Sequence, residues 1–76
     1  MSPVARSRPD WLDTQERISW NGSQRWRSPD GKRIFTYDHL HGHIEVFNRR
    51  GVHMGVADVR TGQWIDEPVP GRRIDV

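Results

Sequence analysis

The chain has 76 residues, of which 33% are hydrophobic and 29% charged, and it contains no cysteine. This length predicts one domain with a small core, and the lack of cysteine excludes disulfides and thiolate sites. The net charge is +2, and eleven of the twelve basic residues are arginine, which suits contacts with phosphates and bases. Nothing in the sequence is typical of a signal peptide or a membrane span. We therefore expect a protein of the cytoplasm, or a domain of a longer chain, with no membrane partner.

The first part of the chain predicts a leader and a helix. Residues 1–8 are expected to form a flexible leader in front of a single domain over residues 9–76. Pro9 suits the first position of a helix, and the charges that follow it run from acidic to basic, as the helix dipole favours. A short helix is therefore predicted over residues 9–20, ended by the turn-forming residues 21–23.

From residue 24 to residue 76 the sequence predicts a sheet, because apolar and polar side chains alternate. Turn-forming residues interrupt this pattern roughly every eight to twelve residues. Strands are predicted over residues 24–27, 33–38, 42–48, 52–57 and 72–76. Pro68 and Pro70 exclude a central strand between the last two. With no helix between them, these strands predict a mainly β fold, a small antiparallel meander with the short helix at its N-terminus.

The richest chemistry lies in the predicted hairpin over residues 37–47. Three of the four histidines lie here with two carboxylates: Asp38, His39, His41, His43 and Glu45. A carboxylate beside a histidine fixes the tautomer of the ring and stabilises its cation, and a second carboxylate can take a proton from a hydroxyl. No serine or cysteine nucleophile lies close by, but RNA supplies its own, the ribose 2′-hydroxyl. A base, an acid and a cation for the phosphate would then suffice to cut RNA.

We expect the strands of this region to have one apolar and one polar face. The predicted buried face holds Ile44, Val46, Val52, Met54 and Val56. The opposite face would then present His43, Glu45 and His53, because side chains alternate along a strand. An apolar face backed by a face of ionisable groups is what a small catalytic or binding surface requires.

The same residues also allow other interpretations. Asp38 is a typical turn-capping residue, and the aromatic residues of the stretch are typical packing residues. The three histidines alternate with Glu45 in phase, so an unbroken strand would present four zinc ligands on one side. Gly42 argues against that site because it indicates a bend.

From Arg25 onward the chain resembles the C-terminal cytotoxic domain of the ribosome-inactivating colicins and cloacin. The matching stretches keep their order and nearly constant spacing: Arg25-Trp26, Gly31-Lys32-Arg33-Ile34, Tyr37-Asp38, His41-Gly42, Ile44-Glu45, His53-Met54-Gly55, Asp58, Thr61-Gly62 and Pro70-Gly71-Arg72-Arg73-Ile74. The resemblance implies a strongly twisted antiparallel sheet. It also implies a ribonuclease that cuts small-subunit ribosomal RNA in the decoding region.

The resemblance implies roles for individual residues as well. Glu45 would be the general base on the 2′-hydroxyl and His41 the general acid for the leaving oxygen. Asp38 would orient His41, and Arg72 would hold the phosphate. The product would be a 2′,3′-cyclic phosphate, formed without a metal or another cofactor. Further contacts with RNA are expected from Lys32, Arg33, Tyr37, His43, Phe47, His53 and Arg73. The chain departs from the family at His43, where the family usually has glutamate, and at Phe47, where it has tyrosine.

The leading hypothesis is a toxin ribonuclease that inactivates the ribosome and so inhibits translation. It would act in the cytoplasm of a target cell or of the producing cell, and an acidic immunity protein would restrain it in its own cell. Two alternatives are a non-catalytic RNA-binding β module that uses arginine and aromatic side chains and a zinc-binding interaction domain.

Overall fold

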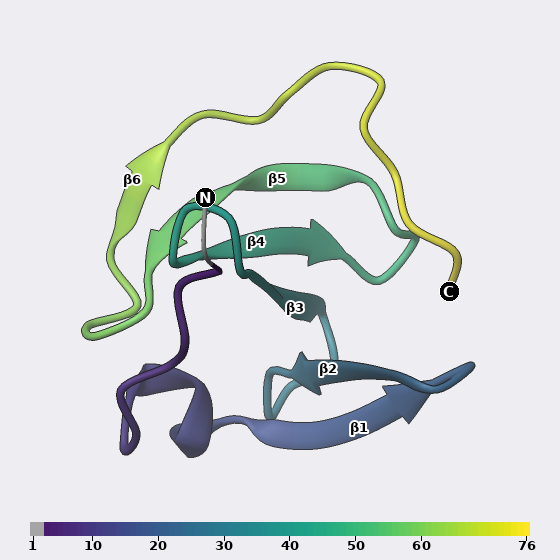
Figure 1. Ribbon diagram of the computed structural model, residues 1–76. Helices are drawn as coiled ribbons and strands as arrows, with labels where there is room; N and C mark the ends of the chain where they lie inside the picture. The colour runs from purple at the N-terminus through teal and green to yellow at the C-terminus, as the bar shows by residue number, and fades with distance from the viewer. Residues whose placement is uncertain (1–2) are drawn as a thin grey trace.

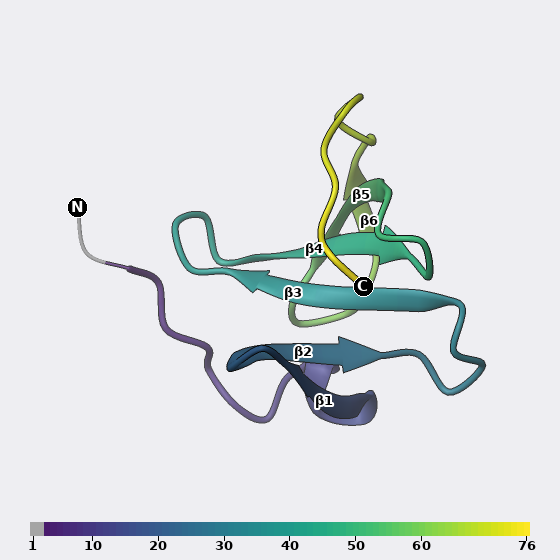
Figure 2. The same ribbon diagram turned by 90° about the vertical axis from the view of Figure 1, so that its right-hand side faces the viewer.

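The computed structural model describes residues 3–76 as one antiparallel sheet whose six strands follow the order of the chain (Figure 1). The elements are a 3-10 turn (Trp11–Thr14), β1 (Glu16–Trp20), β2 (Ser23–Arg27), β3 (Arg33–Asp38), β4 (His43–Asn48), β5 (His53–Asp58) and β6 (Trp64–Asp66). Figure 2 shows the twist of the sheet, which turns β5 and β6 across the direction of β2 and β3. The mainly β meander predicted from the sequence is confirmed. None of the helical segments in residues 3–76 is long and apolar enough to cross a membrane.

The helix predicted over residues 9–20 is wrong beyond Thr14. A single 3-10 turn ends there, and the chain continues as β1, which pairs with β2. The reason lies in Asn21 and Gly22, which have φ angles of 52° and 82°. Two successive positive φ angles make a tight hairpin turn whose twist matches that of its strands. The pair predicted to end a helix therefore joins two strands.

One face of the sheet carries the main core. The buried cluster consists of Leu12, Trp26, Phe35, Ile44, Val46 and Ala57. Leu12 comes from the 3-10 turn, which is fixed over this face by a hydrogen bond from the amide of Trp11 to the carbonyl of Val59 at 2.8 Å. The ring of Trp11 also meets Phe35 edge-on, with 5.0 Å between centroids. We call this side of the sheet the core face.

The predicted leader is docked on the sheet where the structure describes it. The amide of Val4 donates to the carbonyl of His39 at 2.6 Å, and the Tyr37 hydroxyl donates to the carbonyl of Val4 at 2.9 Å. The guanidinium of Arg6 binds both carboxylate oxygens of Asp10 and lies 4.8 Å from the ring centre of Trp26. Residues 1 and 2 of this leader lie outside the described residues.

The prediction that Val52, Met54 and Val56 form the apolar face of β5 is wrong, because the register between β4 and β5 places other residues on the core face. Ile44 lies opposite Ala57 and Val46 opposite Gly55, so these residues share the core face. Val56 lies opposite Glu45 on the other face, and Val52 is exposed.

A β-bulge then changes the phase of β5 at its start. Phe47 pairs with His53 while Val46 pairs with Gly55, so Met54 is the extra residue. In an unbroken ladder His53 would face Asn48 and point to the core face. The bulge instead turns the His53 side chain toward the face of Glu45. The sequence prediction that His53 shares this face is therefore right, through a bulge that the alternation pattern did not reveal.

The chain after β6 forms a broken edge strand. The amide of His53 donates to the carbonyl of Arg72 at 3.0 Å, and the amide of Ile74 donates to the carbonyl of Gly51 at 2.9 Å. The strand predicted over residues 72–76 is reduced to one bridge, between Val52 and Arg73. Between β6 and this bridge the chain loops out around Pro68 and Pro70, which cannot donate to the ladder. We call residues 67–76 the tail; Figure 1 shows it in yellow at the end of the chain.

Candidate active site

The turn between β3 and β4 holds a carboxylate–histidine pair. Nδ1 of His41 lies 2.7 Å from Oδ2 of Asp38. Oδ1 of Asp38 accepts the amides of Leu40 and His41 at 2.9 and 3.3 Å, which orders the turn. Burial acts to raise the pKa of Asp38, but the hydrogen bonds from the His41 ring and from these amides outweigh it, so the pKa lies below its ordinary value of 3.8. Asp38 is therefore ionised near neutral pH, and Nδ1 of His41 is the donor.

This pairing leaves the other nitrogen of His41 free for chemistry. The His41 side chain is 64% exposed, and its Nε2 can give a proton to a group in solvent or substrate. The ring stacks on that of His43, with 6.4 Å between centroids and 19° between planes.

Glu45 lies in the middle of β4 and is held from both sides. Its Oε2 lies 2.6 Å from Nε2 of His53, and its Oε1 accepts a hydrogen bond from Nη1 of Arg72 at 2.6 Å. Arg72 comes from the tail, so a strand residue and a distant part of the chain meet here. A carboxylate has about four lone-pair sites. Glu45 can therefore still accept a proton from an incoming hydroxyl.

His53 is fixed in one tautomer. Its side chain is 0% exposed, and its Nδ1 accepts the amide of Val69 at 2.9 Å. A nitrogen that accepts a hydrogen bond carries no proton, so the proton lies on Nε2 and points at Glu45. The loop around Pro68 and Pro70 supplies this amide, because it carries Val69 over the ring.

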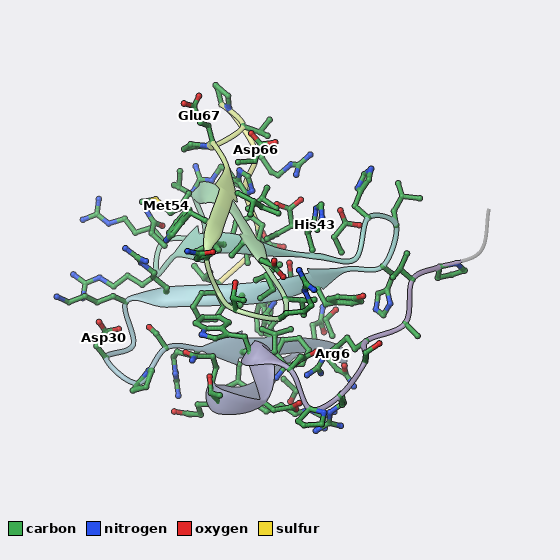
Figure 3. All side chains as sticks on the ribbon, turned by 90° about the vertical axis from the view of Figure 1, so that its left-hand side faces the viewer. Arg6, Asp30, His43, Met54, Asp66 and Glu67 are labelled. Carbon is green, nitrogen blue, oxygen red and sulfur yellow. The ribbon has the colours of Figure 1, made fainter. Side chains whose placement is uncertain are left out.

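These groups line one hollow on the face opposite the core face. Its volume is about 330 Å³, and its lining consists of Asp38, His41, His43, Glu45, Val56, Ile65, Asp66, Val69 and Arg72. His43 also lies opposite Asp58 on β5, whose pKa is lowered mainly by the backbone hydrogen bond from Arg60, and to a smaller degree by His43. His43 and Asp66, which both line the hollow, are labelled in Figure 3. A carboxylate, an exposed imidazole and a guanidinium thus share one opening.

Comparison with known proteins identifies the family of the chain. The family model described as Cytotoxic matches residues 13–75, which include all six strands and the whole hollow. The chain belongs to the Cytotoxic family. The family is that of colicin E3-type ribonuclease domains. Colicin E3 of Escherichia coli is 35% identical over 52 residues, which make up 67% of this chain and 9% of the colicin. The chain therefore spans less than a tenth of the length of that curated relative.

Two of the residues predicted to contact RNA are buried in this Cytotoxic domain, and that prediction needs correction. Phe47 is 2% exposed and packs edge-on against His53, with 5.3 Å between ring centroids. His53 itself is enclosed between Glu45 and Val69. Neither ring presents a face to a base, because the tail covers this end of the sheet. His53 instead contacts Glu45, which lines the hollow.

Four other predicted contacts lie outside the hollow. Tyr37 is on the core face, where its hydroxyl binds the leader. Lys32 and Arg33 lie at the start of β3, at the opposite end from the Asp38 turn. Arg73 is exposed on the tail at the bridge to Val52. Of the predicted set, the hollow brings together Asp38, His41, His43, Glu45 and Arg72.

The structure does not support the zinc alternative in the part of the chain that it describes. No three His, Asp or Glu side chains of residues 3–76 converge as metal ligands. The ring of His39 packs edge-on against Tyr37 at 4.8 Å, whereas His41 turns to Asp38. The turn thus leaves His39 apart from His41 and His43, whose rings stack on each other.

Sequence reasoning missed Val69 and Asp66. Val69 contributes through its backbone amide, which no side-chain pattern signals. Asp66 enters the hollow because β6 pairs with β5 opposite Val56, a long-range register that local alternation did not predict.

Proposed function

We propose that this domain is an endoribonuclease that cleaves small-subunit ribosomal RNA in the decoding region and thereby inhibits translation. The observation that carries the proposal is that two side chains line one hollow: Glu45, which is bonded to Arg72, and His41, which is bonded to Asp38. Membership of the Cytotoxic family supports the same reaction class.

In the proposed reaction the ribose 2′-hydroxyl attacks the adjacent phosphorus. Glu45 takes the hydroxyl proton as the new oxygen–phosphorus bond forms. His41 gives its Nε2 proton to the 5′-oxygen as the old oxygen–phosphorus bond breaks. The products are a 2′,3′-cyclic phosphate and a free 5′-hydroxyl. Asp38 keeps the His41 ring oriented and stabilises its cationic form.

Arg72 is suited to stabilise the charge that develops on the phosphate. One of its five N–H donors is used by Glu45, and the others are available because nearly half of the side chain is exposed. Fixed donors aimed at a developing anion are a major source of rate enhancement. These groups supply a base, an acid and a cation, so the proposed chemistry does not require a metal.

The proposed target and partners follow from the same resemblance. The substrate would be the ribosome, reached in the cytoplasm of a target cell or of the producing cell. An acidic immunity protein would restrain the domain in the cell that makes it.

The test is to incubate the domain with ribosomes in EDTA and map new RNA ends. We expect one dominant cut in the small-subunit RNA that leaves a cyclic phosphate, and no cut by the His41→Ala variant. RNA that is bound but uncut by a folded domain would instead favour a non-catalytic RNA-binding module. Loss of cutting in EDTA that zinc restores would overturn the mechanism.

A further inference from the structure

A second groove lies on the core face, away from Glu45. It encloses about 480 Å³, within the range of small-ligand sites in proteins. Trp11 and Trp64 form its walls, and Phe35, Val46 and Ala57 form its floor. Trp64 pairs with Ala57 in the ladder, so its ring lies on the core face. The groove and the hollow around Glu45 therefore lie on opposite sides of the same sheet.

Glycines position the two tryptophan walls. A Cβ atom at Gly62 would lie 2.3 Å from the Trp11 ring, and one at Gly55 would lie 2.3 Å from the Trp64 ring. Both rings therefore pack closely against these glycines. Trp64 is nevertheless 46% exposed, and the guanidinium of Arg33 lies 5.1 Å from its ring centre. The groove thus presents two tryptophan rings, one of which carries a guanidinium over its face.

The mouth of the groove is positively charged. Lys32 and Arg33 border it, and Lys32 also borders a neighbouring hollow lined by Arg49 and Arg50. Within residues 3–76 none of these four cations has an ion pair. The acidic residue of the groove is Asp30, whose carboxylate accepts bonds from the Ser28 hydroxyl and the Lys32 amide. Figure 3 shows Asp30 and His43 toward opposite ends of the sheet.

We propose that this groove binds an unpaired base of a large folded RNA, with the adjoining phosphates on the four cations. Aromatic faces beside unpaired cations are the combination that single-stranded nucleic acids use. Because the sheet separates the groove from Glu45, the bound base cannot neighbour the cleaved bond. The RNA must instead reach around the end of the sheet. The inference rests on the proposed ribonuclease function and adds a second contact site for the RNA, away from the cleaved bond.

The first experiment measures binding without cleavage. A labelled single-stranded oligodeoxyadenylate lacks the 2′-hydroxyl, so anisotropy reports its affinity alone. Trp64→Ala should weaken binding by roughly five- to 150-fold, the range for one lost base–aromatic stack. The Lys32→Gln/Arg33→Gln variant should lower the salt slope of log K by roughly 1.4, at about 0.7 per phosphate contact.

The matched control is Trp20→Ala. Trp20 is 41% exposed and has Arg25 over its ring at 5.7 Å, but it lies on β1, outside the groove. Its loss should change affinity less than twofold. If Trp20→Ala and Trp64→Ala lose affinity equally, or if Trp64→Ala loses none, the proposal that the groove binds RNA is overturned. Should Trp64→Ala fail to fold, Trp64→Phe should bind like the parent protein, and the Lys32→Gln/Arg33→Gln slope then decides.

The second experiment compares substrates. Trp64→Ala should lower kcat/KM on ribosomes at least tenfold and leave cleavage of a single-stranded RNA that is too short to reach from the hollow to the groove within twofold. A parallel loss on both substrates would contradict a separate docking groove. If the parent protein cuts neither substrate, the proposed function fails. The oligodeoxyadenylate affinities still test whether the groove binds nucleic acid. A different result is that the groove variants keep their affinity for the oligodeoxyadenylate and lose affinity for an acidic protein. That result would assign the groove to a protein partner and overturn the inference.

Discussion

His53 donates a hydrogen bond from Nε2 to Oε2 of Glu45, with 2.6 Å between the two atoms, from a position that solvent does not reach. The amide of Val69 occupies the other ring nitrogen, so the fold determines which nitrogen carries the proton. With Arg72 on its other oxygen, Glu45 has its remaining lone pairs aimed at the hollow. His53 is therefore a positioning residue for the proposed base.

His53→Ala should lower kcat on a short RNA roughly ten- to a hundredfold, since a small misplacement of a reacting group has effects of this size. KM should change little, because His53 does not contact RNA. The variant should also lose about 1–3 kcal/mol of unfolding free energy, because removing the buried His53 ring leaves the Val69 amide without its acceptor. Steady-state kinetics and urea unfolding measure the two effects.

His53→Gln serves as the control, because its amide keeps a donor for Glu45 and an acceptor for Val69. It should recover much of the lost kcat. A His53→Gln variant that regains stability but not kcat would show that the imidazole itself takes part in the reaction.

Glu45→Gln and His41→Ala should each abolish cutting and leave the sheet folded. Both side chains lie on the face opposite the core, so neither change opens a core cavity. By contrast, Ile44→Ala should cost about 2–5 kcal/mol, because this side chain is fully buried. Thermal unfolding and cleavage assays on the three variants check this. A Glu45→Gln protein that unfolds easily yet keeps its activity per folded molecule would contradict the assigned face.

His43 should tune activity rather than carry it. It lies two residues from Glu45 on the same face, and its protonated ring would stabilise the Glu45 carboxylate and weaken it as a base. His43→Ala should therefore keep measurable activity, which a cleavage assay beside the parent protein and His41→Ala measures. If His43→Ala is as inactive as His41→Ala while circular dichroism shows a folded sheet, the acid role must be reassigned.

Asp38 should make the hairpin sensitive to acid. Its pKa is lower in the folded state than the ordinary 3.8, so the stability it contributes is fully present above that value. That stability is lost as pH falls through the lowered pKa. Asp38→Asn cannot titrate, and its unfolding free energy should vary less with pH in this acidic range. Denaturant unfolding at several pH values measures this. An unchanged slope would mean that the Asp38–His41 bond forms equally in the unfolded chain.

The parts of the fold that could be predicted from the sequence are those that depend on neighbours in the chain. The hairpin of β3 and β4 follows from alternating apolar residues and a glycine-containing turn, and it carries Asp38, His41 and Glu45 together. The resemblance to the cytotoxic colicin domains added Arg72, which spacing alone did not connect to Glu45.

The parts that could not be predicted depend on register and on long-range pairing. The Asn21-Gly22 pair suits a helix end and a hairpin equally well, and only pairing with β2 decides between them. The bulge at Met54 reverses the side of His53, which no periodicity reveals. The Val69 amide reaches His53 only because the tail returns to the start of β5.

The tail therefore makes two contacts to the site, from Arg72 to Glu45 and from Val69 to His53, and both depend on the same attachment of the tail. It is fixed at the start of β5 by one bridge, which consists of two backbone hydrogen bonds, and at its end by the Arg25 guanidinium, which donates to the carbonyl of Asp75. Such a short attachment opens locally long before a sheet unfolds. Each opening would take Arg72 from Glu45 and Val69 from His53 in one event, while β1 to β5 stay paired. The heat resistance of the activity would then be set by the lifetime of this short edge attachment rather than by the stability of the core.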